Sequence, residues 1–295
     1  MMKILVIKHG ALGDILLSLP AMAAIRAAHP RAHITLLTTR PFAPLLAASP
    51  WFDTIETDAR PKFWNLHALW RLRRQLRGFA MVYDLQTSGR STRYFTLAGR
   101  PPWSGIAKGC AFPDAAPNRE TTHTRERLEG QLRAAGIPAL PVPDLSWLLR
   151  ADTARFNLPE QFILLVPGAA PHRPEKRWPE QNFAQLAQSL SLPAVIVGGK
   201  VEVELARAIP GLNLAGQTSF FELAAITARA SLAIGNDTGP MHLAAALGIP
   251  SVVLFSAASD PALTAPRYPD GGWTVILRAP NLRDLPVAQV LASLP

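Results

Sequence analysis

Charged side chains follow several apolar runs of this sequence, in positions where strands are expected to end. Asp14 comes shortly after the apolar run at residues 4–7. Substrates of α/β proteins bind where strands end, so Asp14 is placed to act as a general base toward an incoming hydroxyl. The alternative is that Asp14 only caps the helix that follows it.

A polar turn at residues 235–239 is typical of an anion site at the start of a helix. It joins an apolar run to a helix that begins near Pro240, because Pro is favoured at the first helical position. We expect the free amides of Met241 and His242 to point out of this helix and to attract an anion such as a diphosphate. The alternative is that Asp237 and Thr238 only cap the helix.

Two further segments bring charge to the same edge of the expected sheet. Lys176 and Arg177 lie in the loop after the apolar run at 162–166, where two cations can neutralise a diphosphate leaving group. Glu202 follows another apolar run, and a carboxylate in that place can accept hydrogen bonds from ribose hydroxyls. Glu204 is the alternative, and the helix dipole alone also favours acids at both positions.

Positioning these residues requires parallel sheets covered by helices. Strands are expected at 3–8, 34–38, 80–85, 162–166, 194–197, 231–234, 251–255 and 273–277, with helices between most of them. This alternation predicts an α/β protein with doubly wound sheets. Prolines at 136–160 place a domain boundary at about residue 150, which gives domains at 1–150 and 151–280 and a closing helical segment at 281–295. The stretch 101–118 is rich in Pro and Gly and is expected to be irregular.

Basic charge is concentrated in the first half of the chain. Residues 1–150 contain 20 Lys and Arg against 10 Asp and Glu, whereas residues 151–295 contain 10 against 11. This asymmetry favours an acidic partner such as a phosphorylated glycolipid, an anionic membrane surface or nucleic acid. The alternative is a basic surface that reflects a genomic preference for Arg over Lys. The stretch 65–77 predicts a helix with Trp70 and several arginines, either a solvated basic face or one that meets a membrane.

The sequence also indicates a cytoplasmic location. No apolar run approaches the roughly 18 residues of a membrane span. The first residues lack the pattern of a signal peptide. Cys110 is the single cysteine, which excludes an internal disulfide and is typical of a protein in a reducing compartment.

Three segments, at 8–20, 166–179 and 235–255, resemble glycosyltransferase family 9, the heptosyltransferases. The resemblance implies two Rossmann-like doubly wound domains that face each other across a cleft, the arrangement called GT-B. It also implies an inverting, metal-independent transfer of a heptose or related sugar from an ADP-sugar to the inner core of lipopolysaccharide. No cofactor is expected apart from the nucleotide-sugar donor, and peripheral contact with the cytoplasmic face of the inner membrane is expected.

The resemblance also suggests roles for individual residues. Asp14 matches the catalytic base, Lys176 a contact to the donor phosphates and Glu202 a position near the nucleotide. The remaining expected donor-binding residues are Asp237, Thr238, Gly239 and His242. Members of the family often have Ser or Thr where this chain has Ala170, which removes one hydroxyl from the phosphate loop.

The glycolipid acceptor is expected on the first domain. His9 and Gly13 belong to the first motif. Arg90 and Arg93 follow the strand at 80–85, and the planar guanidinium of Arg suits carboxylates and phosphates.

Two other functions are compatible with the sequence. One is the same chemistry on a protein or another glycan. The other is a non-catalytic module that binds nucleotides or nucleic acid, which the net charge of +9 favours. Nucleic acid is nevertheless not expected, because the sequence lacks interleaved aromatic and basic strands and a helix-turn-helix pattern. The spacing of Gly10 and Gly13 departs from the dinucleotide fingerprint, and no D-x-D cluster or His/Cys spacing predicts a metal.

Overall fold

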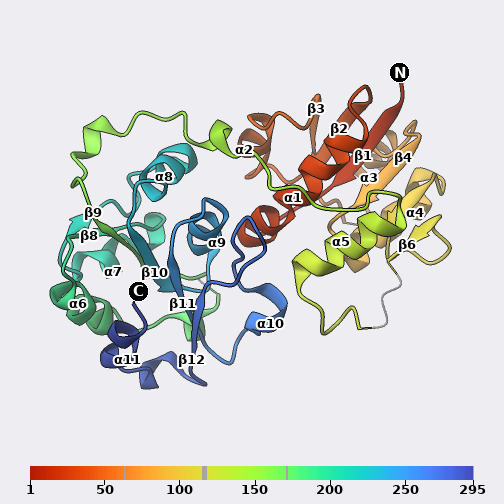
Figure 1. The fold of residues 1–295 in the computed structure, drawn as a ribbon. Helices are drawn as coiled ribbons and strands as arrows, with labels where there is room; N and C mark the ends of the chain where they lie inside the picture. Colours follow the sequence, from red (N-terminus) through yellow and green to blue (C-terminus); the bar gives the residue numbers. More distant parts are fainter. Residues whose placement is uncertain (63, 115–117, 171, 295) are drawn as a thin grey trace. The chain divides into compact units, whose positions relative to one another are not determined.

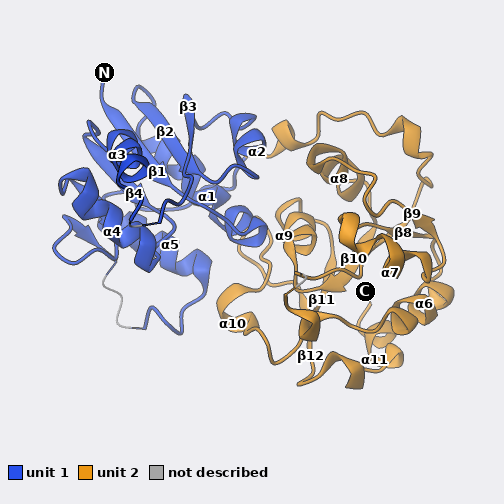
Figure 2. Cartoon of the chain, turned by 180° about the vertical axis from the view of Figure 1, so that it is seen from behind, with its two compact units in different colours: residues 1–143 blue, residues 144–295 orange. Residues whose placement is uncertain are grey.

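The computed structural model describes residues 1–62, 64–114, 118–170 and 172–294. The chain divides into two compact units, Met1–Pro143 and Asp144–Pro295 (Figure 2). The division lies before the boundary predicted at 150, because Trp147 and Leu148 are buried and η1 (Ser146–Leu148) packs on α8 (Phe220–Thr227) of the second unit. Pro295, the last residue of the predicted closing segment, lies outside the described residues.

The first unit contains a parallel sheet with the order β3-β2-β1-β4-β5-β6 (Figure 1). Its strands are β1 (Lys3–Ile7), β2 (His33–Thr38), β3 (Thr54–Thr57), β4 (Met81–Asp84), β5 (Trp103–Gly105) and β6 (Phe112–Pro113). Its helices are α1 (Leu12–Ala28), α2 (Ala43–Ala47), α3 (Leu66–Gln75), α4 (Gly89–Ala98) and α5 (Thr124–Ala134). The predicted irregular stretch at 101–118 therefore contains two short strands.

Both faces of this sheet are covered. Leu5 and Ile7 of β1 share one apolar cluster with residues of α3 and α4. Ile4 and Val6 point to the opposite face and are also fully buried. On the face of the sheet to which Ile4 and Val6 point, α1 packs beside α5. Burial on both faces explains why β1 is apolar throughout rather than alternating.

The second unit repeats this topology, with the parallel order β12-β11-β10-β7-β8-β9. Its strands are β7 (Ile163–Val166), β8 (Ala194–Ile196), β9 (Leu212–Asn213), β10 (Leu232–Asn236), β11 (Ser251–Phe255) and β12 (Val275–Arg278). Its α-helices besides α8 are α6 (Glu180–Ser189), α7 (Val203–Arg207), α9 (Gly239–Ala246), α10 (Pro261–Thr264) and α11 (Val287–Ala292). Its 3-10 turns besides η1 are η2 (Ala154–Phe156), η3 (Pro174–Lys176), η4 (Lys200–Glu202) and η5 (Leu282–Asp284).

The closing helix α11 belongs to the second unit rather than to a separate segment. Val287 and Val290 are buried in the same cluster as Phe183 and Leu186 of α6, and the two helices are in contact. The prediction that the closing segment packs back on the first unit stays a prediction.

The topology of each unit defines where a ligand is expected. In the first sheet the chain leaves β1 for α1 and the neighbouring strand β4 for α4, which covers the opposite face. In the second sheet it leaves β7 toward α6 and β10 toward α9, again on opposite faces. Ligands of such sheets bind outside the carboxyl ends of the strands where the direction of winding reverses. These points are β1/β4 and β7/β10.

None of the described helices combines the length and the apolar character that a membrane span needs.

Candidate active site

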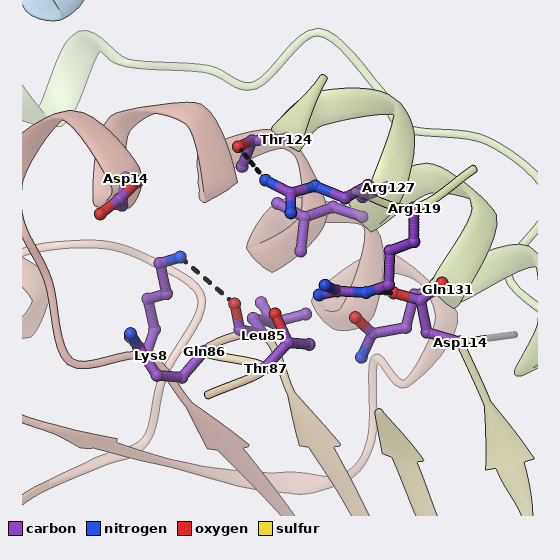
Figure 3. A pocket seen from close by; sticks show the side chains of 11 residues that line it. Lys8, Asp14, Leu85, Gln86, Thr87, Asp114, Arg119, Thr124, Arg127 and Gln131 are labelled. Carbon is purple, nitrogen blue, oxygen red and sulfur yellow. Dashed lines mark hydrogen bonds and ion pairs between the residues drawn. The ribbon is translucent and has the colours of Figure 1, made fainter. Parts of the chain in front are cut away.

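A cavity of about 160 Å³ lies at the β1/β4 point of the first unit (Figure 3). Its lining comes from the end of β1, the first turn of α1, the residues after β4, two residues between β6 and α5, and α5 itself. The lining residues are Lys8, Asp14, Leu85, Gln86, Thr87, Asp114, Arg119, Thr124, Arg127, Leu128 and Gln131. The cavity is therefore polar and lies where the topology places a ligand.

Asp14 has one carboxylate oxygen engaged and one available. It stands in the first turn of α1, and its Oδ2 accepts a hydrogen bond of 3.0 Å from the Ala11 amide. Its Oδ1 has no hydrogen-bond partner in the described part of the chain, and the side chain lines the cavity. Asp14 thus satisfies an amide at the start of the helix, as a capping residue does, and still presents an oxygen that can take a proton.

Cations surround this carboxylate. Lys8 is 4% exposed, and its Nζ donates to the Leu85 carbonyl at 3.2 Å. Burial lowers the pKa of Lys8, and the charges of Asp14 and Asp84 act in the opposite direction. Figure 3 shows the Lys8 side chain on the same side of the cavity as Asp14. A lysine that lines the same cavity as this carboxylate, at the edge of a sheet, can contact an anionic or hydroxyl-bearing ligand.

Two arginines complete the cationic lining. Arg119 pairs with Asp114 at 2.6 Å. Arg127 donates to the Thr124 hydroxyl at 2.8 Å, and no carboxylate of the described residues lies within ion-pair distance of it. Burial, followed by the nearby charge of Arg119, lowers the pKa of Arg127. A partly buried guanidinium without an acidic partner is a binding group for a carboxylate or phosphate.

The four residues predicted to bind the acceptor do not line this cavity. His9 is 1% exposed and its Nε2 lies 3.1 Å from Asp58 Oδ2. Gly13 belongs to the first turn of α1. Arg90 and Arg93 line a separate groove between α3 and α4. Their role in acceptor binding stays a prediction.

The sequence reasoning missed Lys8, Arg119 and Arg127. Lys8 could have been predicted as a site residue, because it directly follows the first strand. The two arginines could not, because only the folded structure brings residues 119–127 close to the end of β1.

In the second unit, Lys176 and Asp237 meet at the β7/β10 point. The Lys176 ammonium lies 2.6 Å from Asp237 Oδ2, which also accepts a bond of 2.8 Å from Ser259 Oγ. His242 Nε2 lies 3.8 Å from the other carboxylate oxygen. Burial by itself raises the pKa of Asp237, but His242 and Lys176 outweigh it and hold that pKa at about 2. Two residues that are predicted to bind the donor, Lys176 and Asp237, are thus in contact with each other. Ser259 is a third residue of this cluster, and sequence reasoning missed it.

Asn236 fixes the loop that carries Lys176. Its fully buried side chain accepts a bond of 3.0 Å from the Trp178 amide and donates to the Pro167 carbonyl at 2.8 Å. The two bonds attach both ends of the loop 167–178 to the end of β10. Asn236 is a second residue that sequence reasoning missed, although its place beside Asp237 was visible.

The start of α9 differs from the prediction. The amides of Met241 and His242 are not free, because both donate to the Thr238 carbonyl, at 3.0 and 3.4 Å. The first residues of the helix fold back as a tight turn, which satisfies these groups. The amides of Thr238 and Gly239 are the ones that donate to no acceptor in the described ranges. They are available to an anion beside Lys176.

The alternative that Asp237 and Thr238 only cap the helix is wrong. Thr238 is the residue that precedes α9, yet its side chain makes no capping bond. The Asp237 carboxylate is bound to Lys176 and Ser259 instead. His242 is 6% exposed, and its Nδ1 has no hydrogen-bond partner among the residues described. These side chains are therefore arranged around one another rather than around the helix end.

Glu202 is 7% exposed and is held by its own turn. Its Oε2 accepts a bond of 2.8 Å from the Gly199 amide, and its Oε1 lies 3.8 Å from Arg177 Nη2. Gly168, after β7, leaves room for it: a Cβ there would lie 2.8 Å from Glu202 Cγ. Glu204, the alternative, is exposed and pairs with Arg207. Contact of Glu202 with a ribose stays a prediction.

Within the residues that the structure describes, no group of three His, Cys, Asp or Glu side chains is arranged to hold a metal ion. Ala170 stands where family members often have Ser or Thr, and its carbonyl accepts a hydrogen bond of 2.8 Å from the Arg173 amide. The charged groups of the second unit can bind an anion, and those of the first can bind an anionic molecule beside the Asp14 carboxylate.

Comparison with known proteins shows which family the chain matches. Residues 69–272, more than half of the chain, match the family described as glycosyltransferase family 9 (heptosyltransferase). Lipopolysaccharide heptosyltransferase 2 of Escherichia coli is 28% identical over 306 residues, which cover 90% of this chain and 85% of that protein. Lipooligosaccharide heptosyltransferase 2 of Haemophilus influenzae is 26% identical over 298 residues, with coverage of 90% and 86%.

Solved structures are similar over both units. The structure of E. coli ADP-heptose lps heptosyltransferase II matches with a TM-score of 0.73 and 24% identity, over 99% of this chain and 97% of that one. E. coli heptosyltransferase WaaC with ADP-2-deoxy-2-fluoro heptose matches with a TM-score of 0.76 and 21% identity, over 99% and 98%. The fold is therefore that of these proteins, as expected from the sequence.

Proposed function

The chain belongs to glycosyltransferase family 9, and we propose that it transfers a heptose from an ADP-activated donor to the core of a lipopolysaccharide. Membership of the family makes it a glycosyltransferase. The relatives named above are heptosyltransferases of lipopolysaccharide or lipooligosaccharide, which supports this choice of sugar and acceptor.

The second unit holds the donor in this proposal. Lys176 and the free amides of Thr238 and Gly239 bind the diphosphate, while Asp237, Ser259 and His242 keep the lysine in place. Glu202 accepts bonds from the ribose. As the bond to the sugar breaks, charge develops on the departing diphosphate, and a fixed ammonium beside backbone amides stabilises it. These groups supply the stabilisation that a metal ion supplies in other transferases, so we propose that transfer is metal-independent.

The first unit holds the acceptor. Arg127, Arg119 and Lys8 bind its acidic groups, and the free oxygen of Asp14 takes the proton from the attacking hydroxyl. The hydroxyl oxygen forms a bond to the anomeric carbon as the diphosphate leaves from the other side, so the configuration inverts. General base catalysis of this kind is typically worth about 10²–10⁴-fold in rate.

The acceptor is part of a lipid, so the proposal includes a cytoplasmic protein that contacts the inner membrane peripherally. The basic surplus of residues 1–150 supports contact with an anionic surface.

The observation that carries the proposed function is the placement of Asp14, with one carboxylate oxygen free, in a cavity lined by Lys8, Arg119 and Arg127. The test is to incubate the protein with ADP-heptose and a heptose-free lipopolysaccharide core, and to measure ADP release and the mass of the acceptor. We expect release of ADP together with addition of one heptose, and little reaction with UDP-glucose. Transfer only to a protein or another glycan, or no ADP release with any acceptor, contradicts the proposal.

A further inference from the structure

Helices α3 and α4 of the first unit form a surface on which apolar and basic side chains occur together. The two helices pack beside each other (Figure 1). Between them lies a groove of about 500 Å³, lined by Pro61, Leu69, Leu72, Arg73, Arg90, Arg93, Tyr94, Thr96 and Leu97. Pockets of about 300–1,000 Å³ accommodate small ligands. The lining is mainly apolar, and three arginines stand among it.

Large apolar side chains are exposed on α3 and just before it. Trp64 is 77% exposed, Leu66 76% and Trp70 55%. Lys62 lies over the Trp64 ring at 5.2 Å, and the Arg74 guanidinium lies over the Trp70 ring at 4.9 Å. Tryptophans with adjacent cations are typical of side chains at the boundary between water and lipid.

Basic charge predominates on this surface, although Glu56 accepts a hydrogen bond of 2.8 Å from Gln75 of α3. Residues 59–113 contain ten Lys and Arg but a single acid, Asp84, which is fully buried. On α3 the exposed basic residues are Arg71, Arg73 and Arg74, and its buried face contributes Leu72 to the apolar cluster under the sheet. The outward side of α3 therefore carries Leu66 and Trp70 together with these arginines, and apolar and basic side chains exposed side by side suit the interface of an anionic membrane.

We propose that the α3–α4 surface docks on an anionic phospholipid bilayer, with Trp64, Leu66 and Trp70 inserted among the headgroups and one acyl chain in the groove. This inference deepens the proposed membrane contact, on which it rests, by assigning the surface. Nucleic acid is the other polyanion that ten cations attract, but it offers nothing to fill an apolar groove or to bury an aliphatic Leu66.

The test is co-sedimentation with vesicles of phosphatidylglycerol and phosphatidylethanolamine at 150 mM salt, compared with vesicles of phosphatidylcholine. The double variant Arg71→Gln/Arg74→Gln should bind the anionic vesicles about 25-fold more weakly, because each basic residue near the surface contributes about fivefold. Leu66→Ser/Trp70→Ser should lose about tenfold or more, because less apolar area is inserted. None of the four positions lines the cavity at Asp14.

Matched controls distinguish this surface from the rest of the molecule. Arg31→Gln/Arg229→Gln removes two exposed arginines, and Val142→Ser/Val201→Ser removes two exposed apolar side chains. Both controls should bind like the parent protein. Transfer to a soluble acceptor without acyl chains should be unchanged in every variant, so a loss there would concern the proposed function and not this surface. Equal binding by parent and α3 variants, equal binding to phosphatidylcholine, or binding of duplex nucleic acid but not vesicles through the same residues overturns the inference.

Discussion

The Lys176 ammonium lies 2.6 Å from the Asp237 carboxylate and so connects the loop after β7 to the end of β10. The second sheet reverses its winding between these two strands. The pair therefore places a fixed positive charge where the fold expects a ligand, before any donor is bound. An arrangement that needs no reorganisation when the diphosphate develops charge is favourable for catalysis.

Removal of the Asp237 carboxylate should destabilise the protein in a pH-dependent way. The folded pKa of Asp237, about 2, lies below its ordinary value, so its ionised form stabilises the fold above about pH 4 and this contribution is lost as pH falls toward 2. Asp237→Asn should therefore lower the free energy of unfolding at pH 7 by about 2 kcal/mol. Urea unfolding of parent and variant measures this, with Glu160→Gln as an exposed control. Equal stability at pH 7 would show that the pair contributes nothing to folding.

Removal of the Lys176 ammonium should weaken binding of the donor. Lys176→Gln deletes a charge-assisted hydrogen bond to the diphosphate, which is worth about 1.5–3 kcal/mol, so ADP should bind about 10–100-fold more weakly. Calorimetry with ADP measures the affinity. Arg229→Gln, which changes an exposed charge elsewhere in the same unit, should bind ADP normally. An unchanged ADP affinity in Lys176→Gln would remove this residue from the donor site.

Binding of the acceptor should depend on Arg127. Arg127→Gln keeps a shorter polar side chain and loses the guanidinium charge, so KM for the acceptor should rise about 10–100-fold while kcat changes less. Arg133→Gln, on the same helix but exposed and paired with Glu129, is the matched control and should behave like the parent. The measurement is steady-state transfer with the acceptor varied. A fall in kcat at constant KM would place Arg127 in the chemistry of transfer rather than in binding.

Asp84 at the end of β4 should make stability depend on pH in the opposite direction to Asp237. Burial raises the pKa of Asp84 to about 6, although the amides of Thr87 and Gln86 donate hydrogen bonds to its Oδ1. Its ionisation is thus disfavoured in the folded state, and stability should fall as pH rises from about 4 to 6. Asp84→Asn keeps an acceptor oxygen for the two amides and should be more stable than the parent above pH 6 by up to about 3 kcal/mol.

Thermal unfolding at pH 4.5 and pH 7.5 tests this prediction. The difference between the variant and the parent should be largest at pH 7.5 and should shrink at pH 4.5. A variant that is less stable than the parent at pH 7.5 would mean that the ionised carboxylate is needed in the fold.

The sequence was sufficient for the architecture because both sheets are buried on two faces. Continuous apolar runs such as Lys3–Ile7 and Ser251–Phe255 could be located within a residue or two. The short strands Trp103–Gly105 and Phe112–Pro113 at the edge of the first sheet were missed, because Pro and Gly beside them indicate turns and two or three residues give no periodicity.

The candidate donor site was also largely predictable, since its residues follow strands and resemble family motifs. What the sequence did not reveal is which polar atoms are already engaged. The Met241 and His242 amides are satisfied by Thr238, and His9 is buried against Asp58. The same holds for contacts between distant segments, such as Arg127 across from Asp14 or Ser259 on Asp237. Such pairs are brought together by topology and leave no pattern in a single sequence.

The most direct test of the account is the rate of heptose transfer by Asp14→Asn, measured together with ADP affinity. The amide oxygen of Asn still accepts the Ala11 amide, so the helix start should be preserved, but the side chain no longer accepts a proton. We expect kcat to fall about 10²–10⁴-fold with ADP binding unchanged. A kcat within a few fold of the parent would contradict the assignment of Asp14 as the base, and with it the proposed mechanism.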